Sequence, residues 1–165
     1  MRILGIDPGT VVMGYGAIES SNTDIALLDY GALTSPKNSS IGERLSSFYQ
    51  RLLGIISRCQ PDEVAVEQPF VAKNVKSALA IGRAQAVAIL ATASAGLPVY
   101  EYTPAQVKQR VTSYGASSKG QIQEMVRLHL GLSQLPQPED AADALAVAIC
   151  HLQETKLNRL ISKQD

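Results

Sequence analysis

Apolar and polar positions divide the chain into a strand-rich N-terminal part and a helix-rich remainder. The apolar run at residues 2–7 predicts a fully buried strand. Residues 13–19 and 25–33 predict two further strands, joined by the polar turn at 20–24. Because these connections are short, we expect the three strands to form an antiparallel meander.

Helical periodicity begins at residue 41, where apolar residues such as Leu45, Phe48 and Leu52 recur on one face. The elements predicted from here on are a helix at 41–58, a strand at 62–67, a helix at 75–95, a strand at 99–102, and helices at 104–111, 118–130 and 138–152. This order predicts one α/β domain over residues 1–155, in which helices flank a five-stranded mixed sheet. The polar residues 156–165 are expected to form a frayed tail.

Composition is typical of a globular domain, since 45% of the 165 residues are hydrophobic and 18% are charged. Fifteen basic residues balance fifteen acidic ones, and this neutral total argues against a nucleic-acid-binding domain. Cys59 and Cys150 have no CxxC spacing and are predicted to be reduced core thiols. No leader is evident and no apolar run approaches the roughly 20 residues of a membrane span, so we expect a cytoplasmic protein.

Two predicted strands end on an acid that is followed by proline, in Ile6-Asp7-Pro8-Gly9 and Val66-Glu67-Gln68-Pro69. Taken singly, such an acid is usually a turn or cap residue. Two of them in one small domain favour a site at the edge of the sheet, where binding sites of α/β proteins collect.

A third group of acids opens the last predicted helix. Asp140 and Asp143 are three residues apart and share one helical face. Glu139 and Asp140 also suit a helix N-terminus, but Asp143 precedes an apolar segment and needs a cation or a hydrogen-bond partner. His151 follows on roughly the same face; it could be a ligand, although a core or surface histidine is the favoured interpretation.

Together these elements supply four carboxylates and thus a candidate all-oxygen site. Such ligands suit Mg²⁺ or Mn²⁺, and paired ions about 4 Å apart act on phosphodiesters. Neutralising four carboxylates would move the formal charge from 0 to +4, which removes the objection from bulk charge. The four acids are Asp7, Glu67, Asp140 and Asp143.

Several motifs occur together in order along essentially the whole chain. They are GIDPGT at 5–10, VEQPF at 66–70, Lys73-Asn74 with Ala78 and Gly82, and DAADAL at 140–145. This combination resembles the RuvC family, the bacterial crossover junction endodeoxyribonucleases or Holliday junction resolvases.

The resemblance implies an RNase H-like fold, a homodimer and two Mg²⁺ ions per site, for which Mn²⁺ can substitute. It implies paired symmetric nicks in a four-way DNA junction that leave 5′-phosphate and 3′-hydroxyl ends, in homologous recombination and DNA repair. It assigns catalysis and metal binding to Asp7, Glu67, Asp140 and Asp143, with Asp7 bridging both ions. A branch-migration motor is a further implied partner.

DNA contacts are expected around these motifs. Phe70 is interpreted as an exposed ring that stacks on an unpaired base, against the alternative of a core aromatic. Lys108 and Lys119 match family residues near the scissile phosphate, although each alone resembles a solvated surface lysine. The duplex arms are expected to contact Lys73, Lys76, Arg83 and Arg110.

The helix at 75–95 predicts the dimer contact. Its apolar residues point in more than one direction, so the sheet cannot cover them all. Its many alanines permit close approach of a second helix. The alternative is a helix packed wholly within the monomer.

Two other function classes stay open. A ribonuclease acting on RNA–DNA hybrids would share the metal site but would need neither a dimer nor Phe70. An actin-like ATPase is suggested by GIDPGT alone, and it would need a second similar domain for which 165 residues leave no room. Cleavage of junction against hybrid, and nucleotide binding, separate the three classes.

Overall fold

The computed structural model describes residues 1–165 except 22–23, 37, 70–74, 116 and 163–165. The strands are β1 (Arg2–Asp7), β2 (Val12–Ser20), β3 (Ile25–Thr34), β4 (Glu63–Glu67) and β5 (Val99–Tyr102). The helices are α1 (Ile41–Cys59), α2 (Val75–Ser94), α3 (Pro104–Thr112), α4 (Lys119–His129) and α5 (Glu139–Ile161). The predicted elements are all present, with ends displaced by a few residues except at the end of α5.

The five strands form one mixed sheet in the order β3-β2-β1-β4-β5. β1, β2 and β3 pair antiparallel, whereas β1 pairs parallel with β4, and β4 with β5. In the parallel pair Ile6 stands opposite Val66, so the next residues, Asp7 and Glu67, lie side by side as the last residues of their strands. The five-stranded mixed sheet expected from the sequence is confirmed.

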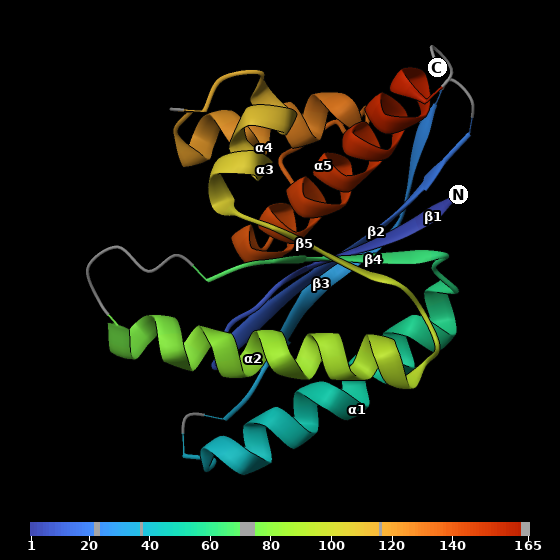
Figure 1. The fold of residues 1–165 in the computed structure, drawn as a ribbon. Helices are drawn as coiled ribbons and strands as arrows, with labels where there is room; N and C mark the ends of the chain where they lie inside the picture. The colour runs from blue at the N-terminus through green and yellow to red at the C-terminus, as the bar shows by residue number, and fades with distance from the viewer. Residues whose placement is uncertain (22–23, 37, 70–74, 116, 163–165) are drawn as a thin grey trace.

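Helices cover both faces of the sheet, α1 and α2 on one and α3, α4 and α5 on the other (Figure 1). Successive strand residues alternate between the two layers, as Ile3 joins the core under α5 and Leu4 the core under α1 and α2. Cys59 and Cys150 are free thiols buried in these cores, as predicted.

The backbone of α5 approaches β1 and β2 unusually closely. A Cβ added at Gly5 would stand 2.1 Å from the carbonyl oxygen of Ala144, and one at Gly14 would stand 1.9 Å from that of Asp140. Only glycine fits at these strand positions, because any side chain would push the helix off the sheet. The first turns of α5, which carry Asp140, are therefore seated directly on the sheet.

One expectation was wrong. The helix predicted to end at 152 continues to Ile161, so 156–161 are helical rather than frayed. These last turns are exposed, and Arg159 contacts the N-terminal residue by donating to the Met1 sulfur at 3.8 Å.

The helix α2 has 20 residues and contains a stretch with a mean hydropathy of 1.3, long and apolar enough to cross a membrane by length and composition alone. The same test is passed by core helices of folded domains.

Candidate active site

Asp7 and Glu67 meet at the carboxyl ends of β1 and β4, and their side chains share a hydrogen bond. Burial, together with the negative charges of Glu67, Asp143 and Asp140, raises the pKa of Asp7 to about 8. Burial likewise raises the pKa of Glu67 to about 7, together with the charge of Asp143. A pair of this kind holds a proton near neutral pH unless a cation replaces it.

Asp143 lies in the second turn of α5 and meets a lysine. The Lys119 ammonium stands 3.0 Å from a carboxylate oxygen of Asp143 and 3.0 Å from one of Glu139. Burial raises the pKa of Asp143, although the hydrogen bond from Lys119 opposes that change. Burial acts to lower the pKa of Lys119, but its bonds to Glu139 and Asp143 outweigh burial and raise it. Lys119 is therefore a cation at physiological pH.

A pocket of about 200 Å³ collects side chains from β4, α3, α4 and α5. Glu67 and Asp143 bring carboxylates to its wall, and Lys108 and Lys119 bring ammonium groups. Apolar neighbours complete the lining: Pro104, Val107, Ile122 and Ala146. Two of the predicted acids and both lysines expected near a phosphate thus share one cavity, with Asp7 bonded to Glu67 behind it.

Helix caps place the two lysines. Ser118 accepts from the backbone N–H of Gln121, whose side chain accepts from that of Ser118, and this capping box makes Lys119 the first residue of α4. An equivalent box of Thr103 and Gln106 opens α3, which carries Lys108. Both helices begin at the edge of the sheet that carries the acids.

The donor chemistry of this cluster fits a hard divalent cation, since carboxylates lie close together with their pKa values raised by burial and by mutual repulsion. Within the described ranges, no three His, Cys, Asp or Glu side chains already stand at metal-ligand spacing. The reason is visible at Asp143, whose charge is met by Lys119. The acids are neighbours that a cation would draw together, rather than a preformed cage.

The other predicted DNA contacts divide into three groups. Lys76 and Arg83 are exposed on α2. Arg110 instead donates to Glu154 at 2.5 Å, so its charge is engaged between α3 and α5. Phe70 and Lys73 lie outside the described residues.

His151 is the core histidine that the sequence favoured, being 2% exposed. Both of its ring nitrogens are engaged, with Tyr102 at 2.6 Å and with Glu63 at 2.6 Å. These partners, and the glycine seat of α5, were missed in the sequence. A buried histidine on an apolar helix was the one signal that could have led to them.

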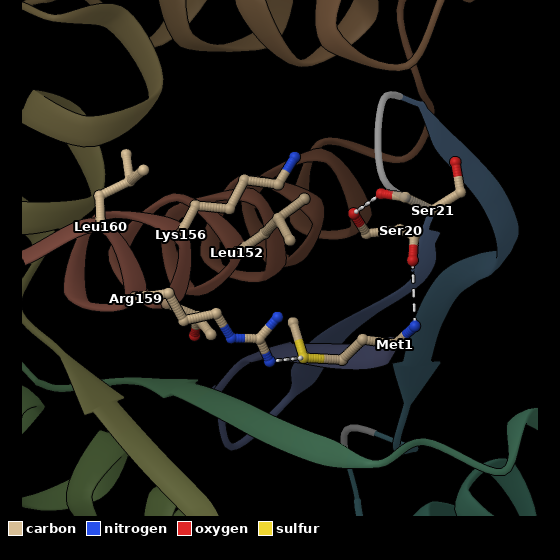
Figure 2. Close-up of a pocket in the computed structure, with 8 residues that line it drawn as sticks. Met1, Ser20, Ser21, Leu152, Lys156, Arg159 and Leu160 are labelled. Atoms are coloured by element: carbon tan, nitrogen blue, oxygen red, sulfur yellow. Dashed lines mark hydrogen bonds between the residues drawn. The ribbon is translucent and has the colours of Figure 1, made fainter. Parts of the chain in front are cut away.

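A larger hollow, of about 410 Å³, lies at the other end of α5 (Figure 2). Arg159 donates to the Met1 sulfur there, and the Met1 ammonium donates to the Ser20 carbonyl oxygen. Its lining residues include no carboxylate side chain. The smaller acidic pocket is therefore the candidate active site.

Comparisons with known proteins agree on one family. The family profile "Crossover junction endodeoxyribonuclease RuvC" matches residues 3–151. A protein of that name from Dehalococcoides mccartyi is 58% identical over 165 residues, covering 100% of this chain and 99% of the relative. One from Chloroflexus aggregans is 56% identical over 151 residues, covering 92% of each.

Solved structures agree with the sequences. Thermus thermophilus RuvC superposes with a TM-score of 0.87 at 34% identity, covering 96% of this chain and 97% of that one. The same protein in complex with a Holliday junction substrate gives 0.90 at 33% identity, covering 96% of each chain. The RNase H-like fold expected from the sequence is thereby confirmed. The chain belongs to the RuvC family of crossover junction endodeoxyribonucleases.

Proposed function

We propose that this chain resolves four-way DNA junctions by paired symmetric nicks, hydrolysing one phosphodiester in each of two opposing strands to 5′-phosphate and 3′-hydroxyl ends. As a family member it is a crossover junction endodeoxyribonuclease. The single observation that carries the finer proposal is the convergence of Glu67 and Asp143, with Asp7 behind, beside Lys108 and Lys119. Its setting would be recombination and repair of DNA in the cytoplasm.

We assign metal binding to the four acids, Asp7, Glu67, Asp140 and Asp143, with Mg²⁺ as the expected ion and Mn²⁺ as a substitute. When bound, two such ions supply an activated water and stabilise the charge of the leaving oxygen. Asp7 and Glu67 then give up the proton that they share, because the cation replaces it. Asp7, the most buried and most strongly perturbed of the acids, is the proposed shared ligand.

The two lysines are assigned to the phosphate. Asp143 can exchange its ion pair with Lys119 for a metal ion, which leaves the Lys119 ammonium to bind a non-bridging phosphate oxygen. Backbone N–H groups at the N-terminus of α4 would add to the same anion site. Lys108, which also lines the pocket, would supply a second cation to the phosphate.

A second copy of the chain is the proposed partner on α2. Val75, Leu79 and Leu90 are 63%, 64% and 57% exposed on this helix. Gly82, between them, has open space where a Cβ would stand, so the described part of the monomer places no steric demand for glycine there. A two-fold dimer through α2 would cover these residues and give each active site one strand of a two-fold substrate. Docking to a branch-migration motor is a further part of this proposal.

The test is incubation with a synthetic four-way junction, with and without Mg²⁺, and mapping of both nicks on a sequencing gel. We expect paired nicks at symmetric positions, 5′-phosphate ends that a ligase can seal, and no product without metal. An RNA–DNA hybrid of the same sequence and an ATP-binding assay run in parallel. Preferential cleavage of the hybrid, or binding of ATP with no junction cleavage, would refute the proposal.

A further inference from the structure

The buried polar chain of Glu63, His151 and Tyr102 has no part in the chemistry proposed above. It links α5 to two strands: His151 lies on α5, Glu63 begins β4 and Tyr102 ends β5. The imidazole also stacks on Tyr100, with ring centroids 4.4 Å apart. Hydrogen bonds have preferred directions, which apolar contacts lack. A buried histidine whose two ring nitrogens are both bonded can therefore fix the relative position of the three elements that it joins.

The donors in this chain are fixed by chemistry. The Glu63 carboxylate accepts, so Nε2 of His151 carries a hydrogen, and in the neutral imidazole Nδ1 accepts from the Tyr102 hydroxyl. Burial raises the pKa of Tyr102, which keeps its hydroxyl a donor. Each group therefore has one role, and the three side chains lock into one arrangement.

The hydrogen bond between Glu63 and His151 lies at one end of the packed pair of β4 and α5, and the acids Glu67 and Asp143 lie at the other end. β4 runs from Glu63 to Glu67, about 13 Å at 3.3 Å per residue. α5 runs from Asp143 to His151, about 12 Å at 1.5 Å per residue. Glu67 and Asp143 share the pocket, and Glu63 and His151 share a hydrogen bond, so helix and strand run antiparallel with matched lengths.

We propose that His151 is a positioning residue: its bonds to Glu63 and Tyr102 set how far α5 is advanced along β4, and so set the spacing of Asp140 and Asp143 from Glu67 and Asp7. A slip of one residue would move the α5 acids by about 1.5 Å, enough to spoil shared metal coordination. The glycine contacts set the distance of α5 from the sheet, while the hydrogen bonds of His151 set the position of α5 along the direction of β4. The inference rests on the proposed metal site.

Tyr102 extends the effect to the lysines. Its backbone stands opposite Glu67, and its carbonyl accepts from the Gln68 N–H at 2.8 Å. The next residue, Thr103, caps α3, which carries Lys108. One side chain bond to Tyr102 thus holds the strand end that supports both Glu67 and Lys108.

The test is a Mn²⁺ titration of the full-length chain, read by the electron paramagnetic resonance signal of the free ion, with no DNA present. For H151F, which keeps a ring of similar size, we expect Mn²⁺ affinity to fall about tenfold, because loss of the bonds to Glu63 and Tyr102 lets the α5 acids shift by about 1 Å relative to Glu67 and Asp7. Y102F breaks one bond and should give a smaller fall. E63Q keeps an oxygen acceptor for the Nε2 hydrogen and should bind Mn²⁺ almost as tightly as wild type. E63A has no such acceptor and should bind Mn²⁺ more weakly.

The matched control is L152A, which removes buried apolar volume from the next residue of α5 and touches no polar partner. All variants are compared at a temperature where circular dichroism reports them fully folded. Y102F and the Glu63 pair serve if H151F does not fold. If L152A weakens Mn²⁺ binding as much as H151F does, or if H151F binds as tightly as wild type, the inference is wrong.

Failure of this inference and failure of the proposed function give different results. A wild-type chain that binds Mn²⁺ but does not cut a junction refutes the function, and the affinities of the variants still decide the role of His151. A wild-type chain that cuts the junction while H151F, Y102F and E63A bind Mn²⁺ unchanged refutes the positioning role alone.

Discussion

At the scale of single residues, the behaviour of the site follows from two acids that share a hydrogen bond in a partly buried place. Asp7 and Glu67 are brought together by the parallel register of β1 and β4. Without a cation, burial and mutual repulsion make their ionised forms costly, and their pKa values rise.

Replacing Asp7 with asparagine should abolish cleavage and spare junction binding. The amide has the size of the carboxylate but is a poor ligand for a hard cation, whereas the lysines proposed to contact DNA are unchanged. We expect cleavage to fall by at least about a thousandfold, since both proposed ions lose a ligand. Gel-shift titration of both proteins in chelator, where neither holds metal, should give a junction affinity within about twofold of wild type; normal cleavage by D7N in Mg²⁺ would refute the metal site.

The same pair makes the metal-free protein less stable as pH rises. The pKa of Asp7 is near 3.8 when unfolded and about 8 when folded, so the folded state binds the extra proton between those values. Stability is therefore full below about pH 4 for this group and is lost as pH rises to about 8. In chelator, we expect Tm to drop by roughly 5 to 10 °C between pH 6 and pH 9.

D7N removes the titrating group and should cut that drop by at least about half. Calorimetry of both proteins across the pH range measures the difference. An identical pH slope in the two proteins would show that Asp7 is not perturbed, and saturating Mg²⁺ should flatten the wild-type slope.

At the scale of elements, the seat of α5 on the sheet determines where its acids stand. The strand glycines beneath it leave no room for a side chain, and the closest contact, at Gly14, lies against the backbone of Asp140 itself. Asp140 is therefore both the residue that packs most closely on the sheet and a proposed metal ligand.

Gly14→Ala should displace the first turn of α5. The new Cβ would overlap the Asp140 carbonyl oxygen, and backbone cannot move as cheaply as a side chain. We expect the free energy of unfolding to fall by about 2 kcal/mol. We also expect the cleavage rate of the folded protein to fall, because Asp140 is displaced. Gly54→Ala is the control, since a Cβ there meets nothing within 4 Å and should stabilise α1 by about 0.5 to 1 kcal/mol. Equal effects of the two changes would refute the close seating of α5.

The elements and the acids could be predicted because each leaves a local pattern. Asp7 and Glu67 end apolar runs, and Asp143 interrupts an apolar helix face. The seat of α5 and the links made by His151 have no such pattern, because they depend on which residues distant in sequence become neighbours. The end of α5 was misplaced for the same reason, since its contact between Arg159 and Met1 joins residues far apart in the sequence.

At the scale of the whole molecule, α2 is a long apolar helix that the monomer leaves mostly uncovered. Only 28% of its most apolar stretch is buried, and the exposed side carries large apolar residues. Such a face is stable in water when a partner covers it.

Leu79→Asp should prevent association without unfolding the chain, because Leu79 is 64% exposed and contributes little to the monomer core. Sedimentation equilibrium should give a dimer for the wild type and a monomer for the variant, and paired nicks should be lost. Leu128→Asp is the matched control, with 54% exposure on α4, and should keep the wild-type mass. A dimer that survives Leu79→Asp would place the partner elsewhere.

The two ion pairs of Lys119 carry a final consequence. In the metal-free chain Lys119 is paired with Asp143, so the proposed metal ligand and the proposed phosphate contact are bound to each other. Breaking this ion pair makes both groups available. By thermodynamic reciprocity, bound metal should raise the affinity for DNA by the same factor by which bound DNA raises the affinity for metal. A nuclease with this ion pair would be inactive in the absence of substrate and metal, and would become active only when both bind.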